Sequence, residues 1–375
     1  MALSRRFREQ VREAHVLVPY AVEGGVKVSP SYDTDDYRRQ LAAWFGELEL
    51  PWTWHALSPQ DADSMLDELS ARTRGQGCVF LNLCDGCDQD GYPGLSVVHA
   101  LERLRLPFSG ADSRFYDVTT CKLRSKSLLR AHDVPTPPWL VVAEPDRDLR
   151  RAAETIGFPL FLKPSISAGS YGLSERSVLV DIAAGLEQFA RLSRMRAAGT
   201  VMGDIFVESF IRGREFTGLV IGDRAAGVRA YPVVERLITE LLEPDKRFLS
   251  YERYWEKYAE EAPVPGGEPL YRYASVPGAL GERLAGLCRD AYLALEGCGY
   301  ARVDLRMDAE GRAFVLEVNS NCGLSDDGLT SVSHILSLTG RRASEMLAEI
   351  LEDAWNRHRR RRAGQAAHPG GPELP

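Results

Sequence analysis

The sequence predicts an α/β protein with α+β parts, organised in three structural units. Two observations carry this prediction. In the first third of the chain, apolar strand patterns alternate with helical patterns, which is typical of a parallel sheet covered by helices. Further along, strand patterns follow one another with fewer helices between them. The length of 375 residues is sufficient for two or three units with cores of their own.

The N-terminal unit contains the parallel layer. Its first apolar strand is expected at 15–19, after which a loop rich in Gly, Ser and Pro leads to a helical pattern. A second apolar strand is expected at 78–83. The expected helices of this unit cover residues 37–45, 60–73 and 95–104.

A basic helical segment follows at about 118–132, and the run Val134-Pro135-Thr136-Pro137-Pro138 ends it because proline cannot continue a helix. A helix is expected near 183–195, and the remaining patterns are strands, at 139–143, 159–163, 176–180, 205–208, 215–222, 228–235, 301–307 and 313–318. The predicted units are an N-terminal α/β domain, a central subdomain, a C-terminal subdomain and a disordered basic tail, at 1–118, 119–204, 205–355 and 356–375 respectively.

Composition narrows the classes of function. The net charge is −7, so nucleic acid is not an expected partner. No run approaches 18 apolar residues and the N-terminus lacks a signal pattern, so we expect a cytoplasmic protein without a membrane partner. The seven cysteines, an odd number, favour reduced thiols, including those of the Cys84-Asp85-Gly86-Cys87 run.

The first chemical motif is a strand that presents Lys163 near its end, followed by a loop of small residues that includes Ala168, Gly169 and Ser170. Small side chains let backbone N–H groups approach an anion, and the lysine adds a point charge. This is the chemistry of a phosphate cradle, although no GKS or GKT follows as in a P-loop. The alternative is an ordinary loop with a surface lysine.

The second motif is a pair of glutamates at strand ends. Glu208 ends the apolar strand pattern at 205–208, and Glu215 begins the next. Backbone groups at such a junction can read the edge of a base, and a carboxylate can accept from sugar hydroxyls. The alternative is two solvated acids beside a turn.

The third motif is a pair of strands with polar residues in alternation. Arg302 and Asp304 share one face of the first strand, and Glu317 and Asn319 share one face of the second. If the strands pair, three oxygen donors converge, and Mg²⁺ prefers such ligands and usually bridges substrate phosphates. The alternative is a half-exposed hairpin with its polar face in solvent.

Together these motifs resemble the ATP-grasp superfamily, and most closely D-alanine–D-alanine ligase. The resemblance covers roughly residues 78–330. The stretches that carry it are Cys121 to Lys126, Val134 to Pro137, the strand with Lys163, Glu208 to Thr217 and Arg302 to Asn319, together with the GYPG and LPFSG runs at 91–94 and 106–110 of the first unit. It implies the ATP-grasp fold, with three domains and a parallel α/β domain first.

The resemblance also implies roles for individual residues. ATP would be bound at its phosphates by two lysines and the small-residue loop, at the adenine amino group by Glu208, beside the base by the hinge, and at the ribose by Glu215. Two Mg²⁺ ions, or Mn²⁺ in their place, would be held by the three oxygen donors. A lysine of a mobile loop would cover the γ-phosphate, and an arginine and a backbone N–H would form the oxyanion site. In this assignment the phosphate-binding residues are Lys122, Lys163, Ala168, Gly169 and Ser170, and the hinge residues are Phe210 and Ile211. The metal ligands are Asp304, Glu317 and Asn319, the loop lysine is Lys257, and the oxyanion site consists of Arg302 and Gly323.

Both amino-acid-binding parts of the ligase pattern are altered. The run whose glutamate holds the first alanine's ammonium is absent, and Glu23 is the substitute available. Gly328 stands where a serine would hold the acceptor carboxylate, and Asp326 and Asp327 add negative charge there. These aspartates would favour a cationic acceptor, unless they point to solvent. Cys322 is expected to pack or line the substrate site.

We therefore expect an ATP-dependent carboxylate–amine ligase that works through an acyl phosphate, with amino-acid or dipeptide substrates of secondary metabolism. The first alternative is a D-alanine–D-alanine ligase. Alternatives of other classes are a carboxylate kinase and a non-catalytic ATP-binding regulator. The expected partners are a small carboxylate and an amine, and the resemblance implies a homodimer.

Overall fold

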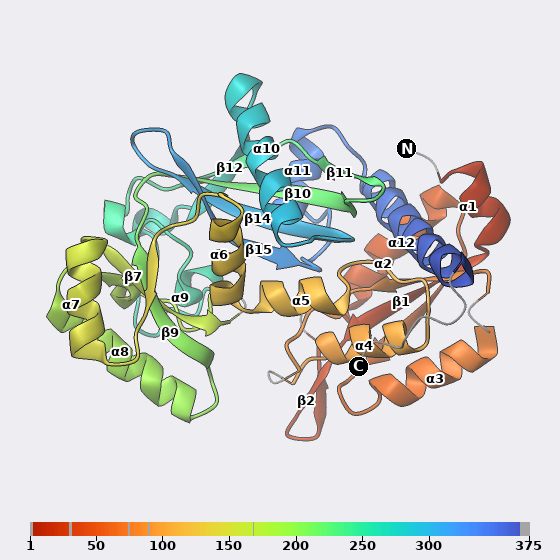
Figure 1. Cartoon of the computed structure of the whole chain (residues 1–375), viewed down its shortest axis with the longest axis horizontal. Coiled ribbons are helices and arrows are strands. Elements are labelled where there is room, and N and C mark those ends of the chain that lie inside the picture. The colour runs from red at the N-terminus through yellow and green to blue at the C-terminus, as the bar shows by residue number, and fades with distance from the viewer. Residues whose placement is uncertain (1–2, 30–31, 74–75, 89–90, 168, 368–375) are drawn as a thin grey trace.

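The computed structural model describes residues 3–29, 32–73, 76–88, 91–167 and 169–367. Its strands form one parallel sheet, two antiparallel sheets and a small hairpin (Figure 1). The hairpin pairs β2 (Ala21–Glu23) with β3 (Val26–Val28) and projects from the N-terminal unit. In the described part of the chain, no helix combines the length and the apolar character needed to cross a bilayer.

The N-terminal sheet is parallel, as predicted, with the order β4–β1–β5. The strand missing from the prediction is β4, whose side chains are mostly half-buried, so its sequence lacks an apolar run. The strands are β1 (Glu13–Pro19), β4 (Trp52–Leu57) and β5 (Cys78–Asn82), and the helices of the unit are α1 (Arg5–Gln10), α2 (Asp35–Leu48), α3 (Ala62–Thr73) and α4 (Leu95–Arg103).

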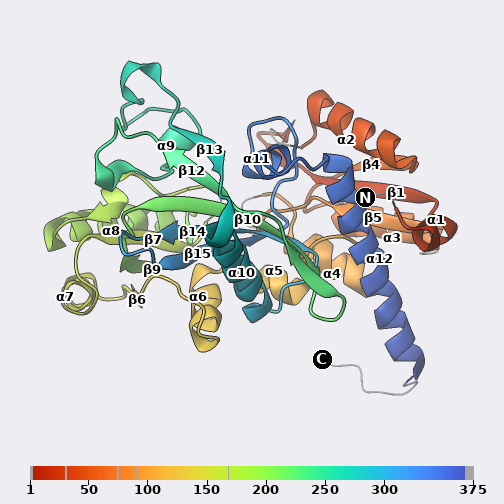
Figure 2. The same ribbon diagram turned by 90° about the horizontal axis from the view of Figure 1, so that it is seen from above.

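The predicted helix at 118–132 is two helices. α5 (Ser113–Thr120) and α6 (Lys122–Ala131) meet at Cys121, whose backbone is extended. The break makes Lys122 the first residue of α6, and α6 lies between the two antiparallel sheets (Figures 1 and 2).

A four-stranded sheet forms the central unit, in the order β6–β9–β7–β8. Its strands are β6 (Trp139–Val141), β7 (Leu160–Ile166), β8 (Val178–Leu179) and β9 (Met202–Ser209), and its helices are α7 (Pro145–Thr155) and α8 (Ile182–Ala197). The predicted boundary between 204 and 205 falls inside β9. Because β9 pairs with β7 through residues on both sides of that point, the junction follows Ser209 instead.

The C-terminal sheet runs β13–β12–β10–β14–β15, with β11 paired to β10. The single strand predicted at 228–235 is two strands, because Pro232 lies between them and lacks an N–H for the ladder. The elements are β10 (Arg214–Asp223), β11 (Gly227–Ala230), β12 (Val234–Ile238), β13 (Tyr271–Ser275), β14 (Tyr300–Met307), β15 (Ala313–Ser320) and α10 (Gly278–Ala294).

The C-terminal helix α12 (Ala343–Ala367) corrects the prediction of a disordered tail from 356. It contacts α2, β5 and β10, so it connects the first and last units. Arg357, within the predicted tail, is buried against the main chain of the N-terminal unit, which fixes this turn of the helix. Residues 368–375 lie outside the described chain. The short elements are α9 (Tyr251–Tyr254), α11 (Ser331–Leu338) and three 3-10 turns at Glu175–Ser177, Pro244–Lys246 and Pro265–Gly267.

Candidate active site

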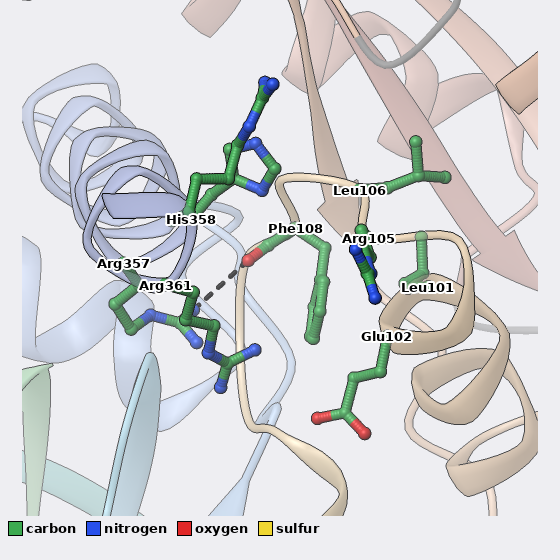
Figure 3. Close-up of a pocket in the computed structure, with 10 residues that line it drawn as sticks. Leu101, Glu102, Arg105, Leu106, Phe108, Arg357, His358 and Arg361 are labelled. Atoms are coloured by element: carbon green, nitrogen blue, oxygen red, sulfur yellow. Dashed lines mark hydrogen bonds between the residues drawn. The ribbon is translucent and has the colours of Figure 1, made fainter. Parts of the chain in front are cut away.

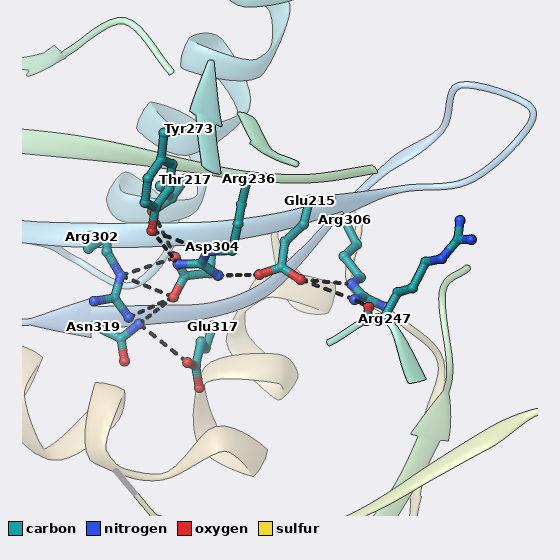
Figure 4. A network of polar contacts seen from close by, with 10 residues as sticks. All are labelled: Glu215, Thr217, Arg236, Arg247, Tyr273, Arg302, Asp304, Arg306, Glu317 and Asn319. Atoms are coloured by element: carbon teal, nitrogen blue, oxygen red, sulfur yellow. Dashed lines mark hydrogen bonds and ion pairs between the residues drawn. The ribbon is translucent and has the colours of Figure 1, made fainter. Parts of the chain in front are cut away.

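Antiparallel pairing of β14 with β15 brings the three expected metal ligands together. Asp304 lies opposite Glu317, and Arg302 lies opposite Asn319. The Asn319 amide donates to Asp304 Oδ2 at 3.0 Å and lies 3.4 Å from Glu317 Oε1 (Figure 4). The polar alternation in the sequence therefore marks one cluster on one face of the sheet.

Asp304 is ionised despite its burial. The Arg302 guanidinium donates to both of its carboxylate oxygens, with Nη2 at 2.8 Å from Oδ2, and Thr217 Oγ1 donates to Oδ1 at 2.8 Å. Burial alone would raise the pKa of Asp304, but Arg302, Arg236 and Thr217 outweigh it and hold the pKa below its usual value. Arg302, the expected oxyanion donor, thus also orients a carboxylate of the cluster.

The donor set fits a hard divalent cation. It offers two carboxylates and one amide oxygen, the ligand types that Mg²⁺ prefers. Asn319 directs its N–H group at both carboxylates here, and a half-turn of the amide would present its oxygen in the same place. The Glu317 side chain is one-third exposed, so this carboxylate is open to a ligand.

Lys122 connects the carboxylate cluster with the small-residue loop. Its ammonium lies 3.6 Å from Glu317 Oε2 and donates to the Ser167 carbonyl at 2.7 Å. Burial lowers the pKa of Lys122, Glu317 opposes the shift and Lys163 adds to it. The lysine from α6 and the carboxylate from β15 therefore face one another.

Glu208 makes contacts other than the adenine contact expected from the sequence. Its carboxylate forms ion pairs with two buried ammonium groups at 2.6 Å each, Oε1 with Lys163 Nζ and Oε2 with Lys126 Nζ. Burial raises the pKa of Glu208, but the two lysines outweigh this and hold it below its usual value. In this structure Glu208 therefore fixes two cations, while the expected adenine contact would need a further acceptor position on the same carboxylate.

Lys126 is a site residue whose role the sequence did not indicate. It lies one turn beyond Lys122 on α6, and its side chain is 1% exposed. Besides Glu208, it donates to Thr136 Oγ1 at 2.8 Å. The i, i+4 spacing places Lys122 and Lys126 on the same face of the helix and could have indicated a shared site. Lys126 could equally be interpreted as a surface residue from the sequence.

The expected ribose ligand Glu215 is held by two arginines. Arg306 donates to Oε2 through Nε and Nη2 at 3.1 Å each, and Arg236 Nη1 donates to Oε1. The guanidinium of Arg236 also contacts the Tyr273 hydroxyl, at 2.8 Å from Nη2. Figure 4 shows Arg236 between Glu215 and Asp304, so Glu215 and the carboxylate cluster belong to one polar network.

The expected hinge residues, Phe210 and Ile211, are buried at the end of β9. Phe210 stacks on Phe161 and meets Phe248 edge-on, which builds a small aromatic cluster. Its N–H donates to Pro159 and the Ile211 carbonyl accepts from Arg306 at 3.0 Å. The aromatic cluster thus lies beside the expected hinge, while these two backbone groups already have partners.

Two loops meet over this region. The Trp255 indole donates to the Gly169 carbonyl at 2.9 Å, and Tyr251 packs edge-on against Tyr171. Gly169 and Ser170 both have positive φ, which bends the small-residue loop, and Ala168 lies outside the described residues. Lys257 is exposed on the second loop and donates to the Tyr251 hydroxyl at 3.1 Å.

Gly323 follows β15. Two residues near it, Tyr32 and Asp85, were not identified as site candidates from the sequence. A Cβ on Gly323 would lie 3.6 Å from the Tyr32 hydroxyl, which donates to Asp85 Oδ2 at 2.6 Å. Tyr32 lies in the connection from β1 to α2, after the β2–β3 hairpin, and Asp85 follows β5, so both belong to segments that leave the carboxyl edge of the parallel sheet, where ligands of open α/β sheets bind. A position after a strand of the parallel sheet could have marked both residues as candidates for the site. Asp85 was overlooked because the CxxC run that contains it was considered only for its cysteines.

The expected amino-acid contacts are dispersed. Glu23 is exposed on the β2–β3 hairpin, while Asp326 accepts from the Trp44 indole at 2.7 Å. The Asp327 carboxylate accepts from the backbone N–H groups of Leu329 and Thr330 and so shapes its own turn, which includes the exposed Gly328. These four residues therefore do not form one cluster in this structure.

Cys322 packs in the core between the units. It is 6% exposed, and burial raises the pKa of its thiol to about 12, with Arg302 opposing the shift. A thiol of that pKa carries almost no thiolate at pH 7. The packing role expected for Cys322 matches this environment.

The fold and these motifs match known proteins. A family profile described as "D-ala D-ala ligase C-terminus" matches residues 128–352. The D-alanine–D-alanine ligase of Bordetella avium is 26% identical over 78% of this chain and 83% of its own, and that of Synechococcus sp. (strain JA-3-3Ab) is 31% identical over 76% and 79%. A crystal structure of the Bacillus anthracis ligase complexed with ATP shares the fold, with a TM-score of 0.60, 19% identity, and 94% and 100% of the two chains covered. The chain therefore belongs to the D-alanine–D-alanine ligase family.

Proposed function

We propose that this protein is an ATP-dependent ligase that joins two amino-acid substrates through an amide bond, with two molecules of D-alanine as the first candidate pair. The relatives carry the name D-alanine–D-alanine ligase, which favours this substrate pair over the secondary-metabolite substrates expected from the sequence. The observation that carries the proposal is the joint placement of Lys122 against Glu317, within the Asp304–Asn319 cluster.

The chain's own groups suit the first half of this reaction. A substrate carboxylate oxygen attacks the γ-phosphorus of ATP, the bond to the bridging oxygen breaks, and ADP leaves. Mg²⁺ held by Asp304, Glu317 and Asn319 would neutralise charge on the phosphates. Lys122, Lys126 and Lys163 would add positive charge near the same phosphates, which reduces repulsion between the two anions.

The second half forms the amide. The amine nitrogen attacks the acyl carbon, the phosphate leaves with its oxygen, and the amine loses a proton. A tetrahedral oxyanion develops in between, and in this proposal Arg302 and the Gly323 N–H would stabilise it. Losing one such donor typically costs about 3–4 kcal/mol in the barrier.

A screen of ADP release tests the proposal. The purified protein is incubated with Mg²⁺, ATP and amino acids, singly and in pairs, and the product is identified by mass spectrometry. We expect ADP release with D-alanine alone, together with one dipeptide per ADP. ADP release without any amide product would identify a carboxylate kinase instead, and no turnover with any pair would contradict the ligase assignment.

A second candidate is a ligase with a cationic acceptor. Asp85 is an exposed carboxylate beside Tyr32 and Gly323, and Asp326 is on the turn that follows Gly323. Negative charge there attracts an ammonium group and repels a carboxylate. In the same screen, turnover with D-alanine and a diamine that exceeds turnover with D-alanine alone would favour this candidate. Asp85→Asn would then reduce the diamine reaction about tenfold and leave ATP affinity unchanged.

A further inference from the structure

A cavity of about 200 Å³ lies between the end of α4 and the helix α12. Its apolar wall consists of Leu101, Leu106 and Phe108. Figure 3 shows the Phe108 ring between Arg105 on one side and the arginines of α12 on the other. The cavity therefore combines an aromatic surface with a cationic rim.

The positive charge of the rim is largely uncompensated. Arg105 and Arg362 have no carboxylate partner among the described residues. Arg361 lies 3.2 Å from Asp112, but both side chains are partly exposed, at 49% and 27%, and such pairs contribute little. Three guanidinium groups thus remain available at one cavity of a chain whose net charge is −7.

The acidic and neutral residues of the lining do not cancel this charge. Glu102 is the carboxylate of the lining; it accepts the backbone N–H of Ser113 at 3.2 Å and keeps its charge, but the lining also contains four arginines, so its net charge stays positive. Burial lowers the pKa of His358, and Arg362 and Arg361 lower it further, so its ring is neutral at pH 7. Its buried Nε2 has no hydrogen-bond partner among the described residues, which leaves one more polar atom for a ligand.

Arg357 makes this lining rigid. Its Nε pairs with Asp353 at 2.7 Å, and Nη2 donates to the carbonyls of Phe108 and Gly110 at 3.2 and 2.8 Å. The guanidinium therefore fixes both the α12 wall and the Phe108 wall. A preformed cavity binds with a smaller loss of conformational entropy than one that must be ordered.

We propose that this cavity binds a small phosphate monoester with an apolar substituent. Phosphate oxygens accept the forked donors of arginine, which explains the choice of phosphate over a neutral ligand. The apolar part would lie against Phe108, Leu101 and Leu106. The Lys122–Glu317 region is built from other elements, so this is a second site and does not depend on the ligase assignment.

Phenyl phosphate is the probe, titrated by calorimetry into the full chain. Mg²⁺ and a non-hydrolysable ATP analogue are present in excess to fill a nucleotide site. The pocket variant is Arg105→Asn with Arg362→Gln, since asparagine tolerates the positive φ of residue 105. The control variant is Arg103→Gln with Arg359→Gln, which removes the same charge from the same two helical regions outside the lining.

We expect phenyl phosphate to bind once per chain, at least tenfold more weakly to the pocket variant and with unchanged affinity to the control. Inorganic phosphate should bind more weakly than phenyl phosphate, because it lacks the contact with the apolar wall. Melting temperatures close to that of the unchanged protein would show that both variants are folded. Absence of binding, equal weakening in both variants, or equal affinity for the two phosphates would each overturn the proposal.

Discussion

Glu208 sets the charge balance on the lysine side of the site. It is a single buried carboxylate between Lys126 and Lys163, and Lys122 has only the more distant Glu317. Three ammonium groups against two carboxylates leave an excess of positive charge in a poorly solvated place. Such an excess is unfavourable in the empty protein and becomes favourable when an anion binds, because desolvated like charges raise each other's energy.

The first prediction concerns pH. Burial lowers the pKa of Lys126 to about 8, with Glu208 opposing the shift and Lys163 adding to it. If the charged form is needed, affinity for Mg–ATP should fall above pH 8 by up to about tenfold per pH unit. Calorimetric titrations between pH 7 and 10 measure this. Lys126→Met should flatten the decrease at lower overall affinity, and Lys246→Met, on the surface, should not.

The same lowered pKa of Lys126 affects the free energy of unfolding in the opposite direction from the affinity for Mg–ATP. The unfolded chain keeps the Lys126 proton up to a pKa of about 10.4, so between pH 8 and that value it binds more protons than the folded chain. The contribution of this group to the free energy of unfolding therefore rises with pH in that window. A loss of affinity that merely followed a loss of stability would contradict the first prediction.

The second prediction concerns Glu317. Glu317→Gln keeps the shape of the side chain and removes one charge of the proposed metal site. We expect ADP release to fall at least about a hundredfold, comparable to the loss of one preorganised electrostatic group. Because the side chain is one-third exposed, the melting temperature should change little. Glu310→Gln, at the β14–β15 turn, is the matched control, and near-normal turnover of Glu317→Gln would remove the metal assignment.

At the scale of elements, local sequence patterns predicted where the strands lie but did not predict which elements pack against one another. The strands β7, β9, β14 and β15 are apolar runs with clear alternation, so their positions and polar faces followed from the sequence. That Glu208 meets Lys126 depends on how α6 packs against β7, the neighbour of β9 in the central sheet, and no local pattern encodes this packing. The break at Cys121 was also missed, because the residues around it are all compatible with a helix.

The third prediction concerns the contact between the two loops. Trp255→Phe removes the hydrogen bond to Gly169, and a hydrogen bond of this kind contributes about 1 kcal/mol net. That corresponds to about fivefold more opening of the loop. Limited trypsin digestion should cleave after the exposed Lys257 faster by this factor, and faster still in Trp255→Ala. Equal cleavage rates in all three proteins would show that the contact does not hold the loop.

At the scale of the whole molecule, α12 joins the first and last units. The run of arginines from 357 was interpreted as a disordered tail because clustered charge usually is solvated. The structure buries one of these arginines and exposes others, which a count of charges cannot distinguish. The buried contact is specific: Arg357 satisfies two carbonyls of the N-terminal unit and the Asp353 carboxylate together.

The fourth prediction compares two truncations of α12. Deleting residues 357–375 removes Arg357 and leaves Asp353, a buried acid whose pKa is already raised by burial, without its cation. Breaking a buried pair in this way costs about 3–5 kcal/mol in the free energy of unfolding. Deleting 364–375 keeps the contact and should cost less than about 0.5 kcal/mol, as for surface changes generally. Urea denaturation of both proteins measures the difference.

A third protein separates the ion pair from the helix itself. Asp353→Leu in the 357–375 deletion removes the unpaired acid, so part of the lost stability should return, while the carbonyls of Phe108 and Gly110 still lack their donor. If instead both truncations are equally stable, the last turns of α12 do not hold the units together, and the contact of α12 with α2 and β5 must carry that connection alone.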